Sequence, residues 1–256
     1  MNVAIVKYNA GNIYSVVNAL KRLGIDPLLT DDAEQLKKAD KVLFPGQGHA
    51  GEAMDYLRAH KLDILIRDLQ QPVFGICVGQ QLLCRHSEEG NTNCIGIFDA
   101  EVKRFQPERH EDKVPCMGWN QLHNLQSPLF KGLNEGDYVY FVHSFYVPVC
   151  QETIATADYI LPYSASMHRN NFYTCQFHPE KSGRVGEQII KNFIDLSLNS
   201  FLLSTLLLVS AYVSPKATTN RRVSMASLWR WPASFNASDS SACIWLTSTA
   251  LNQSIL

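Results

Sequence analysis

The sequence predicts an α/β fold in which helices cover both faces of a mostly parallel central sheet. Two observations lead to this prediction. Short, continuously apolar runs rich in β-branched residues alternate with longer segments whose apolar residues recur at helical spacing. Glycine and proline separate many of these segments. A strand that is apolar on both sides must be covered on both faces of its sheet, and alternating helices provide that cover.

The first half of the chain contains most of these segments. Asn9 to Asn12 predicts a loop after the first strand, and Gly24 stops the helix that follows. Pro45-Gly46-Gln47-Gly48 ends the third strand. We expect strands at 2–7, 27–30, 41–44 and 72–76, and helices at 13–23, 53–68 and 80–84.

The second half contributes further strands and then changes in character. We expect strands at 138–142, 154–157 and 172–177 and a closing helix at 185–196. From Ser197 onward Asp239 is the only acidic residue, and serine, threonine and leucine dominate. The sequence therefore predicts one folded domain over residues 1–196, followed by an atypical tail over 197–256.

Composition indicates an ordinary globular protein. The chain is 46% apolar and 18% charged, with a formal net charge of -1, so it lacks the basic excess that a nucleic-acid-binding face would leave. The N-terminus does not resemble a signal peptide, and the seven cysteines show no metal-ligand spacing. We expect a cytoplasmic location with reduced thiols, and no metal, cofactor, nucleic acid or membrane.

The segment Gly75-Ile-Cys-Val-Gly79 has the pattern of a nucleophile elbow, a sharp turn that presents a reactive side chain between a strand and a helix. Its glycines permit the tight turn and keep other side chains away from the reacting atom. The N-terminus of the following helix favours a thiolate. Cys77 is therefore the candidate nucleophile, and the alternative is a buried cysteine in a glycine-rich turn.

The segment Gln176-Phe-His-Pro-Glu180 supplies the groups that a cysteine nucleophile needs. His178 can take the proton from the thiol and return it to a leaving group, and Glu180 can orient the ring through its other nitrogen. Pro179 stiffens the backbone between them. A histidine and a glutamate at this spacing are, taken alone, more typical of a surface loop, but the cysteine turn favours a catalytic role.

These motifs together resemble the class I (triad) glutamine amidotransferases, over residues 1–196. Met117-Gly-Trp-Asn120 and His143-Ser-Phe-Tyr-Val147 are similar to the glutaminase subunits of imidazole glycerol phosphate synthases. Asn9-Ala-Gly-Asn12-Ile-Tyr-Ser15 and Phe44-Pro-Gly-Gln-Gly48 fit the same group. The resemblance implies a class I glutamine amidotransferase-like fold.

The resemblance also implies a mechanism and a set of site residues. Cys77 would attack the side-chain amide of glutamine to form a γ-glutamyl thioester, which water hydrolyses to glutamate. Gly46, Gln47 and Gly48 match the segment whose backbone, with that of Val78, forms the oxyanion hole. Gln81 and the backbone of Ser144 and Phe145 match positions that hold glutamine. Gln47 stands where the family usually has valine, and Cys116 where it commonly has histidine.

The same resemblance implies a partner: a (β/α)8 cyclase subunit that uses the ammonia to make imidazole glycerol phosphate and AICAR in histidine biosynthesis. In this sequence the residues that match family positions near that interface are Asn12, Trp119, Tyr140 and Lys181. From the sequence alone, Trp119 could equally be a core residue and Lys181 a solvated loop charge.

Two other functions stay open. One is the glutaminase of another pathway, such as aminodeoxychorismate, anthranilate or pyridoxal phosphate synthesis, which Met117-Gly-Trp-Asn120 argues against. The other is a catalytically silent scaffold subunit on the same fold, which intact Cys77, His178 and Glu180 oppose.

The tail has an apolar stretch at 198–213 that is short for a membrane span. Shifting the reading frame by one base permits, over 199–219 and 243–252, peptides similar to the start of the (β/α)8 isomerase of histidine biosynthesis. We therefore expect that the tail is an out-of-frame reading of a neighbouring gene and has no native fold.

Overall fold

The computed structural model describes residues 1–8, 11 and 13–196. Apart from Gly11, the loop predicted at 9–12 lies outside the described residues, as does the whole tail from Ser197. In the described part of the chain, no helix is both long and apolar enough to cross a membrane.

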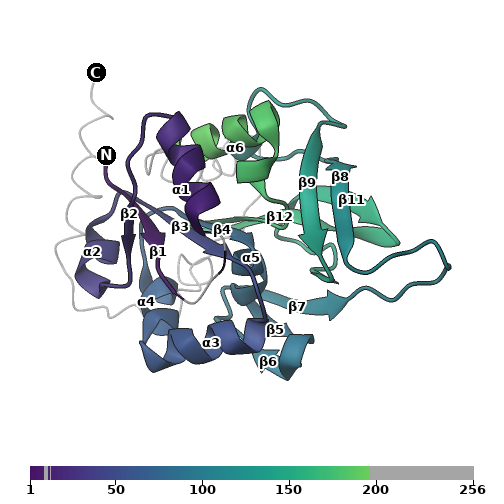
Figure 1. The fold of residues 1–256 in the computed structure, drawn as a ribbon, viewed down its shortest axis with the longest axis horizontal. Coiled ribbons are helices and arrows are strands. Elements are labelled where there is room, and N and C mark those ends of the chain that lie inside the picture. The colour runs from purple at the N-terminus through teal and green to yellow at the C-terminus, as the bar shows by residue number, and fades with distance from the viewer. Residues whose placement is uncertain (9–10, 12, 197–256) are drawn as a thin grey trace, which may run out of the picture. The chain divides into compact units, whose positions relative to one another are not determined.

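A seven-stranded sheet forms the centre of the domain, in the order β11-β12-β13-β4-β3-β1-β2 (Figure 1). Its strands are β1 (Val3–Val6), β2 (Leu28–Thr30), β3 (Lys41–Gly46), β4 (Val73–Cys77), β11 (Thr153–Tyr159), β12 (Leu161–Arg169) and β13 (Phe172–Cys175). Strands β1 to β4 and β13 pair in parallel, whereas β12 is antiparallel to both of its neighbours. The predicted mostly parallel sheet is confirmed.

Helices cover both faces of this sheet, as expected. Helices α1 (Ile13–Arg22) and α6 (Gly183–Asp195) lie on one face, and α3 (Ala50–Ala59) and α4 (Leu62–Asp68) on the other (Figure 1). Helix α2 (Ala33–Lys38) precedes β3, and the short α5 (Val78–Leu82) follows β4 directly. Each long helix buries one apolar stripe; α1, for instance, buries Ile13, Val16, Ala19 and Leu20.

Two smaller sheets complete the domain. One has the order β10-β7-β5-β6, with β10 (Phe145–Tyr146), β7 (Phe98–Arg104), β5 (Cys84–Ser87) and β6 (Thr92–Asn93). The other pairs β8 (Cys116–Gln121) with β9 (Tyr138–His143). The described residues also form three 3-10 turns, η1 (Glu89–Asn91), η2 (Pro128–Phe130) and η3 (Pro179–Lys181). Of these, η2 lies against the last turn of α6, where Asn192 bonds the Leu129 and Lys131 carbonyls.

The structure corrects three predicted boundaries. The helix expected at 53–68 is two helices, because Lys61 adopts a left-handed conformation with φ of 57°. No glycine or proline marks that break, so the apolar spacing continues across it. Strand β3 continues through Pro45 to Gly46. The helix expected at 80–84 begins at Val78, and Cys84 already belongs to β5.

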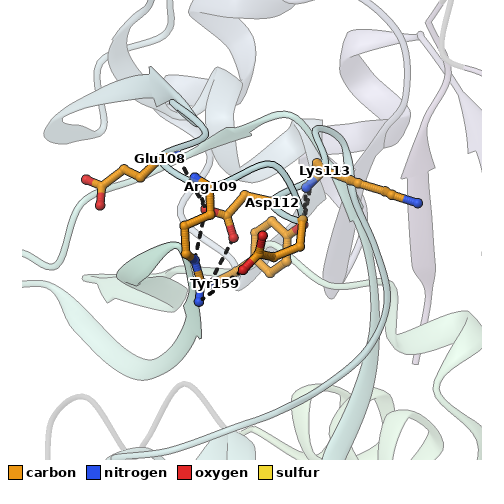
Figure 2. Close-up of polar contacts among 6 residues, drawn as sticks. Glu108, Arg109, Asp112, Lys113 and Tyr159 are labelled. Atoms are coloured by element: carbon orange, nitrogen blue, oxygen red, sulfur yellow. Dashed lines mark hydrogen bonds and ion pairs between the residues drawn. The ribbon is translucent and has the colours of Figure 1, made fainter.

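A long loop between β7 and β8 is fastened by its own polar groups (Figure 2). Arg109 pairs with Asp112 at 3.0 Å. The Tyr159 hydroxyl accepts a hydrogen bond from the Lys113 amide at 3.1 Å and donates one to the Lys113 carbonyl at 2.6 Å. The loop is thereby tied to the end of β11 just before Pro115, which lines the cavity described below.

Candidate active site

Cys77 lies at the sharp turn that the sequence predicts, as the last residue of β4 and the N-cap of α5. Its backbone has φ of 55° and ψ of -111°, a strained conformation for a residue with a side chain. The turn needs Gly79, because a Cβ there would lie 1.9 Å from the Phe44 carbonyl oxygen. It also needs Gly46, where a Cβ would lie 2.8 Å from the Gly79 nitrogen. The glycines therefore let β3 approach the turn that presents Cys77.

His178 and Glu180 form a buried pair at the carboxyl end of β13. The Nδ1 atom of His178 lies 2.8 Å from Oε1 of Glu180, and both side chains are 2% exposed. Burial disfavours the charged ring, but the neighbouring Cys77 and Glu180 outweigh burial and raise the pKa of His178 to about 10. The pair therefore favours an imidazolium beside Cys77.

Hydrogen bonds to strand β9 fix the backbone of His178. The His178 amide donates to the Tyr140 carbonyl at 2.8 Å. The Ser182 hydroxyl donates to the His178 carbonyl at 2.6 Å and accepts from the Tyr140 amide at 2.9 Å. Ser182 was not a candidate from the sequence, because its role depends on two residues that are distant along the chain.

These side chains meet at a cavity of about 460 Å³ at the carboxyl ends of the parallel strands. Ten residues singled out in the sequence line it: Gln47, Gly48, Cys77, Val78, Gln81, Tyr140, Ser144, Phe145, His178 and Lys181. Gly46, Glu180 and Trp119 do not line it, and Asn12 lies outside the described residues. Gly46 pairs with Cys77 in the sheet, and Glu180 contacts the cavity only through His178.

Four residues near the cavity were missed by sequence reasoning. Glu89 and His143 line it directly. Gln176 is fully buried against Cys77, with Nε2 at 3.7 Å from Sγ. Tyr8 is buried and donates from its hydroxyl to the Pro45 carbonyl at 2.8 Å, next to Gly46. The sequence spacing could have identified Gln176. It lies two residues before His178 near the end of a strand, so the two side chains lie on the same face of that strand.

His143 is held neutral inside this site. Its Nδ1 lies 2.7 Å from the Phe145 carbonyl oxygen, so Nδ1 carries the hydrogen. Burial, reinforced by the nearby His178, lowers the pKa of His143 to about 4 despite that bond. Within the described residues its buried Nε2 has no hydrogen-bond partner. His143 therefore fixes the segment Ser144–Phe145 without adding charge to the cavity.

No group of three or more His, Cys, Asp or Glu side chains in the described ranges is arranged to hold a metal ion. The site contains a thiol, an imidazole bonded to a carboxylate, and the first backbone N–H groups of α5, which have no intrahelical partner. This arrangement suits acyl transfer through a thioester.

Comparison with known proteins agrees with this chemistry. The family model described as glutamine amidotransferase class-I matches residues 4–196. Imidazole glycerol phosphate synthase subunit HisH of Bacteroides thetaiotaomicron is 61% identical over 196 residues, which are 77% of this chain and all of that protein. The chain belongs to the HisH family of class I glutamine amidotransferases.

Other members of the HisH family and more distant structures extend the comparison. The HisH subunit of Idiomarina loihiensis is 44% identical over 199 residues, covering 77% of this chain and all of that protein. A solved glutamine amidotransferase structure superposes with a TM-score of 0.58 at 18% identity, over 76% of this chain and 98% of its own. PurLQS from Thermotoga maritima gives 0.55 at 16% identity, over 76% and 97% of the two chains. The structural matches support the fold alone.

Proposed function

We propose that this glutamine amidotransferase hydrolyses glutamine through Cys77, His178 and Glu180, and supplies the ammonia to a cyclase subunit in histidine biosynthesis. The observation that carries the proposal is the buried His178–Glu180 pair beside a strained Cys77 at the wall of the cavity. Its relatives at 41–61% identity are HisH subunits, which favours this pathway over the other glutaminases considered above.

In the first step the Cys77 sulfur attacks the side-chain carbonyl carbon of glutamine. The C–N bond breaks, and His178 gives its proton to the leaving ammonia, which leaves a γ-glutamyl thioester. In the second step His178 takes a proton from water as the water attacks the thioester, and glutamate departs as the Cys77 thiolate re-forms. Glu180 keeps the ring oriented through both steps, as its 2.8 Å bond to Nδ1 indicates.

The oxyanion of each tetrahedral intermediate needs preformed N–H donors. We assign them to the Gly46–Gly48 segment and to Val78, which flank Cys77 from β3 and α5. The Tyr8 hydroxyl, bonded to the Pro45 carbonyl, holds the start of that segment. Gln47 extends toward Gly11, where an added Cβ would lie 3.5 Å from its Oε1. The oxyanion segment therefore lies close to Gly11.

Recognition of glutamine falls to the remaining walls of the cavity. We assign contacts with the substrate to Gln81 and to the backbone of Ser144 and Phe145. Glu89 is a lining carboxylate whose negative charge complements the α-ammonium group. Its Oε2 accepts from the Ala50 amide at 2.7 Å, and among the described residues no hydrogen bond engages its Oε1.

The partner that fits this assignment is a (β/α)8 cyclase subunit, docked on the outer face of the β8–β9 sheet. Met117, Trp119 and Tyr138 expose 65%, 56% and 53% of their surface there, and large exposed apolar side chains of this kind are typical of interfaces. Trp119 packs edge-on against Tyr140, which lines the cavity together with Lys181. Ammonia released at Cys77 would pass these two residues, and Asn12 belongs to the same proposed surface.

We further propose that the native domain is residues 1–196, in the cytoplasm, and that 197–256 is an out-of-frame tail. The curated relatives support the boundary, because 196 to 199 aligned residues cover them completely. Reading the DNA across codon 196 tests it. Codons incompatible with the frame-shifted peptides would refute the out-of-frame origin.

A coupled assay tests the function. Glutamate release from glutamine is measured with the full chain alone, with the cyclase subunit, and with an unrelated (β/α)8 protein. We expect hydrolysis to depend on the cyclase and to disappear in Cys77→Ala. Hydrolysis that no barrel subunit affects would contradict the assigned pathway, and hydrolysis retained by Cys77→Ala would contradict the assigned nucleophile.

A further inference from the structure

Gln176 lies fully buried between Gln81 and Cys77 and has no role in the mechanism described so far. Its Oε1 accepts a hydrogen bond from Nε2 of Gln81 at 3.0 Å. Its Nε2 points at the Cys77 sulfur, 3.7 Å away. A buried amide with both ends engaged is fixed in orientation, so its position beside the nucleophile has chemical consequences.

Phe145, Gln81, Gln176 and Cys77 are joined in series by hydrogen bonds. The donor and acceptor of each bond follow from the Phe145 backbone carbonyl. The Phe145 oxygen can only accept, and it lies 3.1 Å from the Gln81 side chain, so the nitrogen of Gln81 must face it. That same nitrogen faces Gln176, which must therefore present its oxygen to Gln81. The remaining nitrogen of Gln176 then faces Cys77. The reverse orientation would place two N–H donors against each other.

We propose that the Gln176 side-chain amide donates a hydrogen bond to the Cys77 thiolate, and that Gln81 holds that amide in the donating orientation. This role rests on the proposed function of Cys77 as the nucleophile. Gln176 touches the reacting sulfur and is in that sense a catalytic residue, whereas Gln81 acts on the sulfur only through it.

The amide suits this task because it is neutral and cannot take the proton. His178 supplies charge and accepts the proton, whereas Gln176 stabilises the thiolate without competing for it. The Val142 carbonyl oxygen also lies near the sulfur, at 3.9 Å; a thiol could approach it as a weak donor, but it repels a thiolate. The donor from Gln176 offsets that repulsion.

This series of hydrogen bonds also connects Cys77 to the cavity assigned to the substrate. Gln81 and Phe145 line the cavity, and both belong to the hydrogen-bonded chain that ends at Cys77. The Phe145 carbonyl is fixed a second time by Nδ1 of His143 at 2.7 Å. Residues assigned to hold glutamine are therefore the residues that orient the thiolate donor.

The test measures how readily the Cys77 thiolate forms. The full chain is treated with iodoacetamide over a range of pH, and the rate of alkylation at Cys77 is followed by peptide mass spectrometry. In Gln176→Met we expect the midpoint of this pH profile to rise by about one unit, and the rate below the midpoint to fall about tenfold, the size expected for one hydrogen bond to a charged group. An unchanged midpoint overturns the proposal.

Gln80 provides a matched control. It is also fully buried and bonded at both ends of its amide, to the Ser164 carbonyl at 3.1 Å and to Oγ1 of Thr174 at 2.8 Å, and neither bond involves Cys77. Gln80→Met should leave the midpoint at the wild-type value. Equal shifts in both variants would mean that any lost core amide loosens the site, and would overturn the specific role of Gln176.

Two further variants keep the outcome decisive. If Gln176→Met does not fold, Gln81→Met carries the test, because it frees the Gln176 amide to rotate and should raise the midpoint by a smaller amount. No shift in Gln81→Met then overturns the proposal. Cys77→Ala separates the two hypotheses: if it still hydrolyses glutamine in the presence of the cyclase, the proposed function fails. If it is inactive while Gln176→Met keeps the wild-type midpoint, only the role of Gln176 fails.

Discussion

Two buried histidines at the same cavity are held in opposite charge states. His178 faces a buried carboxylate and a cysteine, which raise its pKa to about 10 against the effect of burial. His143 is bonded to the uncharged Phe145 carbonyl, so burial dominates and, with the nearby His178, lowers its pKa to about 4. The bonding partner of each ring, rather than its depth, decides its charge. One ring can then exchange protons while the other positions backbone.

The neutral state of His143 makes the domain sensitive to acid. Its folded pKa of about 4 lies below the ordinary 6.5, so the unfolded chain binds the proton first and stability falls as pH drops from about 6.5 through 4. The shift corresponds to about 3 kcal/mol of unfolding free energy between neutral pH and pH 4. Urea unfolding at several pH values should show a smaller acid loss in His143→Gln by about that amount. Identical pH dependence in both proteins would contradict the assignment.

Glu89 is assigned to the α-ammonium group of glutamine, and that assignment predicts a binding defect. Glu89→Gln keeps the shape and the bond to the Ala50 amide but removes the charge. We expect KM for glutamine to rise about 10- to 100-fold with kcat nearly unchanged, because the contact is equally strong in ground and transition states. Steady-state kinetics with the cyclase present measures both constants. A fall in kcat at unchanged KM would place Glu89 in the chemical step instead.

Local motifs were enough to predict Cys77, His178 and Glu180 as candidates, because each motif holds its residues within a few positions. Gln176 lay inside a quoted motif yet had no assigned role, since its partners Gln81 and Cys77 come from another segment. Glu89 gave no periodic or spacing signal of its own. Side chains that act through distant partners need the fold before their roles appear.

At the scale of elements, β9 serves both the nucleophile and the base. Its Val142 carbonyl lies near the Cys77 sulfur, and its Tyr140 carbonyl accepts from the His178 amide. The side chain of Trp119, which pairs with Tyr140 across this strand pair, lies on the same face as Tyr140 and is 56% exposed. Tyr140 therefore contacts both the backbone of His178 and the exposed Trp119. The sequence predicted β9 but not its contact with the base.

The proposed docking surface predicts a loss of affinity in Trp119→Ala. Burying this indole against the cyclase should contribute at least about 2 kcal/mol, so we expect Kd to rise about 30-fold or more by titration calorimetry. The free energy of unfolding of the isolated chain should change little, since the side chain is 56% exposed. Ile64→Ala on α4, where Ile64 is 54% exposed, is the control and should leave Kd unchanged. An equal loss in both variants would argue against docking at β8–β9.

Some strands were not predicted because their sequences lack a clear apolar pattern. Strand β12 was missed because it buries Ser164 and Ser166, whose hydroxyls bond the Pro148 and Thr174 carbonyls. Buried serines break the apolar run that marks a central strand. The strands of the two small sheets are short or half exposed, so apart from β9 they were not predicted. The parallel strands, which are mostly apolar, were predicted to within two residues at each end.

At the scale of the whole molecule, the site lies where the carboxyl ends of β3, β4 and β13 meet. Those three strands are adjacent in the sheet although they lie far apart in the sequence, and each ends in a turn that carries site residues. The last described helix, α6, is fixed at its end as well, because the Lys41 ammonium donates to the Leu196 carbonyl and lies over the Phe193 ring. The end of α6 is thus held in place by contacts within residues 1–196.

Because these contacts hold the end of α6, we predict that residues 1–196 fold without the tail. A chain ending at Leu196 keeps the Lys41 contact and all the site contacts named above. We expect its melting temperature to lie within about 2 °C of the full chain, which is a change of about 1 kcal/mol or less for a domain of this size, and its cyclase-dependent glutaminase activity to be equal. Calorimetry and the coupled assay check both. A truncated chain that fails to fold would show that the tail is part of the native domain.

The central claim is that Cys77 forms the covalent bond to glutamine. Burial raises the pKa of the Cys84 and Cys175 thiols, and that of Cys116 to about 11, which keeps these groups protonated and unreactive near neutral pH. The direct measurement is peptide mass spectrometry of the full chain with the cyclase, after treatment with a diazoketone analogue of glutamine. We predict one label per chain, on Cys77, blocked by excess glutamine and absent from Cys77→Ala. Label on another cysteine, or a Cys77→Ala chain that is still labelled and still releases ammonia, would contradict the account.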